Sequence, residues 1–221
     1  RESHPILPDN FRNSVARLGS LLKRLQQNPE VLQEYNSVIM EQSAKGIIED
    51  VPEEALPAGG VHYIPHHGVI RHDKDTTKLR VVFDASSKTD DVSLNNCLSS
   101  GPCLVPKLFD VLLRFRCHRL ALIADIEKVF LNVGIAAKHR DFLRFLWIDN
   151  YNELHPKIII KRMTRVMFGV TSSPFLLGGT LEHHISRYEQ QEPKIVSKLL
   201  ESFYVDDLNS GEDNVEQAFE L

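Results

Sequence analysis

The chain has 221 residues, enough for one large domain or two small ones, and a net charge of −4. Apolar residues make up 42% of it and charged residues 25%, so composition gives no argument for disorder. No run approaches the roughly 18 apolar residues of a membrane span, and the N-terminus lacks the apolar segment of a signal peptide. Three cysteines without a CxxC pair support neither a disulfide framework nor a zinc knuckle. The first residue is Arg, not Met, so we expect a piece of a longer chain.

Two amphipathic helices are predicted near the N-terminus, over residues 11–28 and 30–45. Apolar residues recur at helical spacing in both, and Gly46 is the expected stop of the second helix. A loop rich in Pro, Glu, Ala and Gly follows at 52–60 and is the predicted boundary of this helical segment.

From Val61 the pattern changes to that of β-strands. Apolar runs at 68–71 and 79–83 flank a polar segment, which predicts a hairpin whose tip carries Lys74, Lys78 and Arg80. The later elements predicted are a helix at 104–115, strands at 120–124, 142–148 and 157–163, a helix from Pro174 towards Tyr188, and a strand at 202–208. This order predicts an α+β fold with a split βαβ (ferredoxin-like) sheet and helices on one face.

Basic residues concentrate between Lys107 and Arg165, where 12 Lys and Arg stand against 6 Asp and Glu. We call these residues the basic stretch. A basic middle in an acidic chain fits a surface that follows a phosphate backbone. A solvated charge pattern without a partner fits the same count equally well.

Carboxylates follow two of the predicted apolar strands, Asp125 after the first and Asp206 with Asp207 after the last. A charge beside a buried strand costs several kcal/mol unless something compensates it, and magnesium, which prefers oxygen ligands, is one compensation. If the strands are neighbours, the carboxylates of Asp125 and Asp206 should lie within roughly 4–7 Å and hold two ions for phosphoryl chemistry. The alternative is that each Asp ends a strand and faces solvent.

Three segments resemble the palm motifs of reverse transcriptases and occur in the same order. They are ADIEKVF at 124–130, with an aromatic residue five positions after the Asp, FGVTSSP at 168–174, and FYVDDL at 203–208, which resembles the YxDD box. Further segments are similar to the polymerase region of Pao/BEL-type long-terminal-repeat retrotransposons: HPILPDNF at 4–11, VHYIPHHGVI at 61–70, TTKLRVVFDAS at 76–86, SLNNCLSSGP at 93–102 and DFLRFLW at 141–147. The resemblance covers nearly the whole chain.

The resemblance implies an RNA-directed DNA polymerase that adds deoxynucleotides from dNTPs to a primer 3′-hydroxyl on an RNA or DNA template. It implies a right-hand polymerase fold, with a helical segment at 1–60, a fingers hairpin region at 61–105 and a palm at 106–221 that ends before a thumb. The implied partners are template–primer, dNTPs and the thumb, RNase H, protease and integrase of the same polyprotein, with no role for a membrane. The implied location is the cytoplasm, inside virus-like particles. Without a thumb, we expect weak template–primer binding and poor extension.

Site residues also follow from the resemblance. Asp125, Asp206 and Asp207, assisted by the backbone carbonyl of Ile126, would bind two Mg²⁺ ions, with Mn²⁺ as an alternative. The implied nucleotide-binding residues are Lys78, Arg80, Phe130, Phe168 and Gly169. Among them, Arg80 would grip the triphosphate with its planar fork, and Phe130 would exclude a ribose 2′-hydroxyl. The implied template and primer contacts are Tyr204, Val205, Ser173 and Pro174. For Phe130 and Phe168 the alternative is ordinary core packing.

Two other interpretations remain open at the level of the sequence. One is a non-catalytic or domesticated binding domain that keeps the fold without turnover. The other is a different two-metal enzyme, such as a phosphatase or a nuclease. Phe130, Arg80 and the order of the motifs argue against a hydrolase, which needs none of them.

Overall fold

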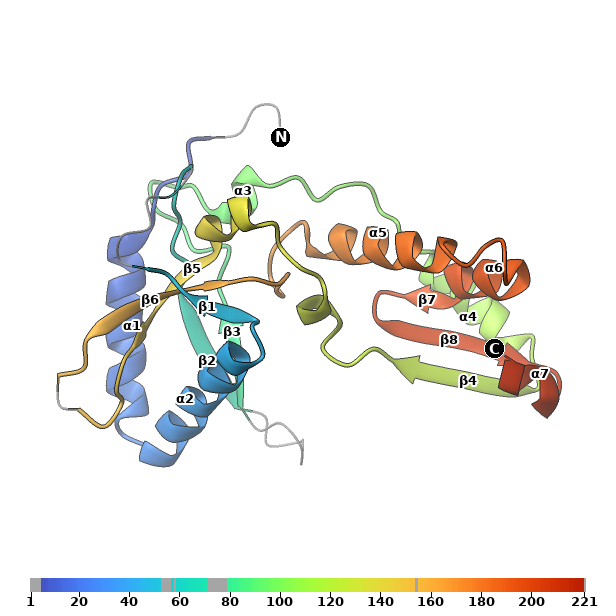
Figure 1. Cartoon of the computed structure of the whole chain (residues 1–221), viewed down its shortest axis with the longest axis horizontal. Coiled ribbons are helices and arrows are strands. Elements are labelled where there is room, and N and C mark those ends of the chain that lie inside the picture. The colour runs from blue at the N-terminus through green and yellow to red at the C-terminus, as the bar shows by residue number, and fades with distance from the viewer. Residues whose placement is uncertain (1–4, 53–56, 58, 71–78, 154, 221) are drawn as a thin grey trace. The chain divides into compact units, whose positions relative to one another are not determined.

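The computed structural model describes residues 5–52, 57, 59–70, 79–153 and 155–220, which form an α+β protein (Figure 1). The chain divides into two compact units. Unit 1 comprises residues 1–99 and 134–171, and unit 2 comprises residues 100–133 and 172–221. The predicted α+β class is confirmed.

The units differ from the expected division at 1–60, 61–105 and 106–221. The physical reason is strand pairing: β5 (Arg144–Ile148) and β6 (Ile158–Met163) form one antiparallel sheet with β1 (Ile48–Asp50), in the order β1-β6-β5. Two strands expected in the palm region therefore belong to the N-terminal unit.

Unit 1 begins with the two predicted helices, α1 (Phe11–Leu25) and α2 (Pro29–Ala44). Gly46 follows α2 with a φ of 64°, a left-handed conformation that glycine adopts without steric cost, so it ends the helix as expected. α1 packs against β5, and α2 packs against β1 (Figure 1).

The predicted hairpin is also present in unit 1. β2 (His66–Ile70) pairs with β3 (Leu79–Phe83) in antiparallel register. Its tip at 71–78, with Lys74 and Lys78, lies outside the described residues. Two short elements complete this unit, the helix α3 (Leu94–Cys97) and the 3-10 helix η2 (Ala137–Leu143).

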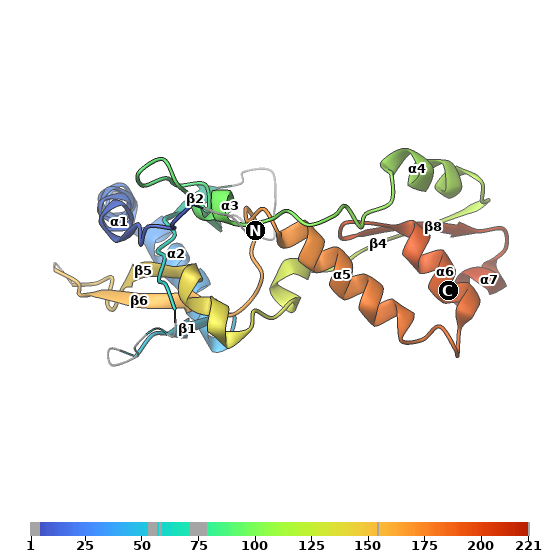
Figure 2. The same cartoon turned by 90° about the horizontal axis from the view of Figure 1, so that it is seen from above.

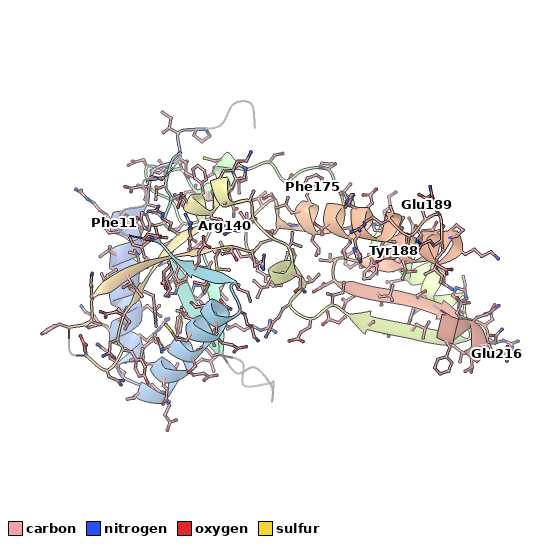
Figure 3. All side chains as sticks on the ribbon, in the orientation of Figure 1. Phe11, Arg140, Phe175, Tyr188, Glu189 and Glu216 are labelled. Carbon is pink, nitrogen blue, oxygen red and sulfur yellow. The ribbon has the colours of Figure 1, made fainter. Side chains whose placement is uncertain are left out.

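An aromatic cluster forms the centre of unit 1. The rings of Tyr35 and Trp147 stack at 5.0 Å, and neither side chain is exposed. His66 is buried beside them, with its Nδ1 2.5 Å from the Tyr35 hydroxyl and its Nε2 2.8 Å from the carbonyl oxygen of Leu146. Burial lowers the pKa of His66 to about 4, so this ring is neutral near pH 7 and packs as part of the core. The ring of Phe11, which Figure 3 labels, packs edge-on against that of Tyr63, with 5.0 Å between the ring centroids.

An ion-pair network uses part of the basic stretch. Arg162 bridges Glu49 at 2.6 Å and Asp141 at 2.7 Å, while Arg144 binds Asp141 at 2.9 Å and Arg140 binds Glu49 at 3.0 Å. Burial opposes ionisation of Asp141, but hydrogen bonds from Arg162 and Arg144 outweigh it and hold the pKa of that carboxyl below its ordinary value. These arginines are already paired, so the charge count overstates the basic surface open to a polyanion.

Unit 2 contains a three-stranded antiparallel sheet in the order β4-β8-β7, made of β4 (Leu120–Asp125), β7 (Phe203–Tyr204) and β8 (Asp207–Glu212). The helices α4 (Leu108–Arg116) and α6 (Pro193–Ser202) both pack against β8 and touch each other (Figures 1 and 2). α5 (Ser173–Ser186) packs against α6, and α7 (Val215–Glu220) follows β8.

Two expectations for unit 2 are wrong. Residues 202–208 do not form one strand that ends in two acids: β7 ends at Tyr204, the chain reverses at Val205 and Asp206, and Asp207 begins β8. β4 is not a buried strand either, since Ile123 is 70% exposed on the face that also carries Asp125. β4 is an edge strand, and that face is uncovered within the part of the chain that the structure describes.

Candidate metal centre

The register between β4 and β8 brings the predicted acids together. The two strands pair from Leu120 opposite Glu212 to Asp125 opposite Asp207, so an acid at the end of one strand meets an acid at the start of the other. The N–H of Ile126 donates to the backbone carbonyl of Asp206 at 3.2 Å, which continues the contact beyond the last strand pair.

One carboxylate oxygen from each of Asp125, Asp206 and Asp207 lies within 4.8 Å of the others. We call these three residues the acid cluster. Its geometry agrees with the expected separation of the Asp125 and Asp206 carboxylates. Its environment does not agree with the expected burial, because Asp125 and Asp207 are exposed and Asp206 is half-buried. The cost of a buried charge is therefore not the reason for a metal here.

Mutual repulsion among the three carboxylates is a better reason to expect a metal ion at the acid cluster. Two unit charges 4–5 Å apart in water repel by about 1 kcal/mol, and the cluster contains three such pairs. Among the described residues, no Lys, Arg or His forms an ion pair with any of the three carboxylates. The nearest basic residue in sequence, Lys128, is paired with Glu127. Carboxylates only accept hydrogen bonds, and hard oxygen ligands suit Mg²⁺ or Mn²⁺, so the cluster fits a divalent cation.

The turn that carries Asp206 is strained. Val205 has a φ of 62°, a left-handed conformation that costs an L-residue roughly 1–2 kcal/mol and that β-branched residues rarely adopt. Two-residue hairpin turns with a positive φ at their first position normally use glycine, asparagine or aspartate there. Such strain persists only where surrounding structure holds it, and it is common at functional sites. No turn residue in the sequence signals this hairpin, which is why the predicted strand ran through it.

Other predicted site residues in unit 2 lie on neighbouring elements. Phe130 is 5% exposed on the 3-10 helix η1 (Val129–Asn132), so its ring packs in the unit, as the alternative of core packing requires. Its role as a steric gate stays a prediction, as does the metal contact of the Ile126 carbonyl. Tyr204 is half-exposed and pairs with Asp207 across the hairpin. Ser173 is buried at the start of α5, and Pro174 is exposed beside it.

The remaining predicted site residues belong to unit 1. Arg80 is exposed on β3, opposite Val69 of β2. Phe168 is 59% exposed, and Gly169 follows it with a φ of 85° and accepts a hydrogen bond from Asn95 at 2.9 Å. Lys78 lies outside the described residues. The nucleotide-binding roles of all four residues stay predictions.

No family model matches the chain, and no curated protein matches it at a significant level. Among the described residues, no helix has both the length and the apolar character needed to cross a membrane.

Proposed function

We propose that the chain is the fingers and palm part of an RNA-directed DNA polymerase of the Pao/BEL retrotransposon type. In this proposal unit 2 is the palm, and the hairpin of β2 and β3 in unit 1 belongs to the fingers. One observation carries the proposal: the acids of two motifs that resemble those of reverse transcriptases, 81 residues apart, converge to within 4.8 Å on an exposed sheet face.

The proposed reaction is two-metal transfer of a nucleotide to a primer 3′-hydroxyl, with Asp125, Asp206 and Asp207 holding the ions. When bound, two Mg²⁺ ions would lower the pKa of the attacking hydroxyl and neutralise charge on the transferred phosphate. The protein's part is to keep three mutually repelling carboxylates converged, which it does through the β4–β8 register and the hydrogen bond from Ile126 to Asp206.

Substrate binding in this proposal uses the remaining motif residues. Arg80, with Lys78, binds the triphosphate of the dNTP, because a guanidinium fork can hold two phosphate oxygens. Phe130 favours deoxynucleotides, and Tyr204 with Val205 contacts the primer. The proposed partners in the same polyprotein are a thumb, an RNase H, a protease and an integrase.

Product length on a DNA primer annealed to an RNA template tests this function. With dNTPs and Mg²⁺, the full chain should lengthen the primer, whereas a two-metal nuclease would shorten it and a binding domain would leave it unaltered. Asp206→Asn should abolish the lengthening. Glu216→Gln is the matched control, because Glu216 is an exposed acid on α7, which follows the other end of β8 (Figure 3).

Two outcomes would refute the proposal. Shortening of the primer that depends on Asp206 would assign the acid cluster to hydrolysis. Lengthening that is equal in Asp206→Asn would show that another site, or a contaminant, carries the activity.

A further inference from the structure

Unit 2 contains a cavity of about 540 Å³ between the C-terminal end of α4, the helix α6 and the strand β8. Small-molecule sites in proteins span about 300–1,000 Å³, so its size suits a compact organic ligand. Nothing in the polymerase reaction proposed above uses this cavity.

The cavity is separate from the acid cluster. Ser210, which lines it, is three residues beyond Asp207 on β8, and side chains alternate between the two faces of a strand. Glu212, on the same face as Ser210, is bound by Lys198 of α6, so this is the face that α6 approaches. Asp207 points to the opposite face.

Unused hydrogen-bond donors gather around the cavity. Ser210 is 3% exposed, and its buried hydroxyl has no hydrogen-bond partner among the described residues. Arg114 donates to the backbone carbonyl of Glu201 at 2.8 Å, while its buried Nε makes no hydrogen bond and lies 3.8 Å from the Glu201 carboxylate. Lys194 lies in the first turn of α6, where no side chain of the described residues caps the helix start. Pro193 has no N–H, so the N–H groups of Lys194 and Ile195 are the unused backbone donors there.

The charged and apolar residues that line the cavity indicate which class of ligand it would bind. Three basic side chains line the cavity, but Lys198 is paired with Glu212 and Arg114 lies 3.8 Å from the Glu201 carboxylate. Lys194 forms no ion pair among the described residues, and the start of α6 adds the positive end of a helix dipole. The ring of Phe115 adds apolar surface. The unpaired charge of Lys194 and the unused donors favour an anion, and the ring of Phe115 favours an apolar body attached to it.

We propose that this cavity is a binding site for a small organic anion, an apolar ring or chain that bears a phosphate or carboxylate group. The anionic group binds Lys194 and the start of α6, and the body of the ligand extends past Phe115 towards Ser210 and Arg114. The site is independent of the acid cluster.

Calorimetric titration of the full chain with phenyl phosphate tests the site. Phenyl phosphate should bind at least tenfold more tightly than inorganic phosphate, which lacks the apolar body. Lys194→Gln should weaken phenyl phosphate binding about tenfold, since a charge-assisted hydrogen bond contributes about that factor. Lys194 is exposed at a helix start, so this change is compatible with folding. Arg116→Gln is the matched control, because Arg116 is an exposed residue of α4 outside the cavity lining.

A second variant separates this site from the proposed polymerase. Asp206→Asn should leave phenyl phosphate affinity unchanged, whether or not the chain extends primers. Equal affinity for phenyl phosphate and inorganic phosphate would overturn the proposal, and so would binding that survives Lys194→Gln. Loss of binding in Asp206→Asn would place the phosphate at the acid cluster and overturn it as well.

Discussion

Asp125 and Asp207 lie directly opposite each other as the last residue pair of the β4–β8 ladder. Side chains on paired strands share a face when they are in register, so the two carboxylates project together. A slip of one residue would send Asp207 to the face of Ser210 and remove it from the acid cluster. The register of one antiparallel strand pair therefore decides whether the three acids converge.

Repulsion within the acid cluster predicts that removing one of its charges raises the free energy of unfolding without metal and lowers it with metal. Without divalent cations and at low ionic strength, Asp125→Asn should be more stable than the wild type by about 1–2 kcal/mol, because it removes two repulsive pairs. Saturating Mg²⁺ should reverse the order, since ions that bind only the folded state stabilise it. Urea unfolding with chelator and with Mg²⁺ measures both. Glu216→Gln should show neither effect, and an Asp125→Asn variant that is less stable in both conditions would refute the repulsion.

The strained turn predicts that glycine is a more stable replacement than alanine at position 205, which is the reverse of the usual order. Glycine is ordinarily the less stable replacement because it gains more chain entropy on unfolding. At a φ of 62°, alanine keeps the Cβ that makes this conformation unfavourable, whereas glycine does not. Val205→Gly should therefore be more stable than Val205→Ala by about 1 kcal/mol, measured by urea unfolding. If alanine is the more stable of the two, Val205 does not hold a left-handed turn.

Buried His66 predicts an acid-sensitive component of stability in unit 1. Its pKa falls from 6.5 in the unfolded chain to about 4 in the folded one, because burial disfavours the charged ring. A depressed folded pKa gives stability that is complete above pH 6.5 and is lost as pH falls towards 4. The loss amounts to roughly 3 kcal/mol in all, at about 1.4 kcal/mol for each unit of pKa shift.

The pH dependence of unfolding in the wild type and one variant measures this component. His66→Gln should be less stable than the wild type at neutral pH. The difference in their free energies of unfolding should narrow between pH 6.5 and 4. A difference that stays constant over this range would mean that His66 is not buried as a neutral ring.

Local patterns in the sequence were enough to predict several parts of the structure. The helical spacing in α1 and α2, the glycine stop at Gly46 and the hairpin of β2 and β3 all have local physical causes, and all are confirmed. The convergence of Asp125 with Asp206 was also predictable, because charges at the ends of two apolar segments are an unusual pattern that neighbouring strands explain.

Long-range pairing and backbone strain were not predictable from local patterns. Which unit β5 and β6 join depends on their pairing with β1, and no local signal specifies that partner. The hairpin has Val205 where such a turn normally has glycine, asparagine or aspartate, so its seven-residue segment has the pattern of one strand. The helix α6 was not predicted, and it ends at Ser202, immediately before β7 begins at Phe203.

The rate of single-nucleotide addition to a DNA primer on an RNA template tests the central claim most directly. With one dNTP and Mg²⁺, each of Asp125→Asn, Asp206→Asn and Asp207→Asn should slow the addition at least about 100-fold, because metal stabilisation of the transition state contributes several kcal/mol. Glu216→Gln should retain the wild-type rate. If the wild type adds the nucleotide and any of the three acid variants adds it equally fast, the acid cluster is not the catalytic metal centre.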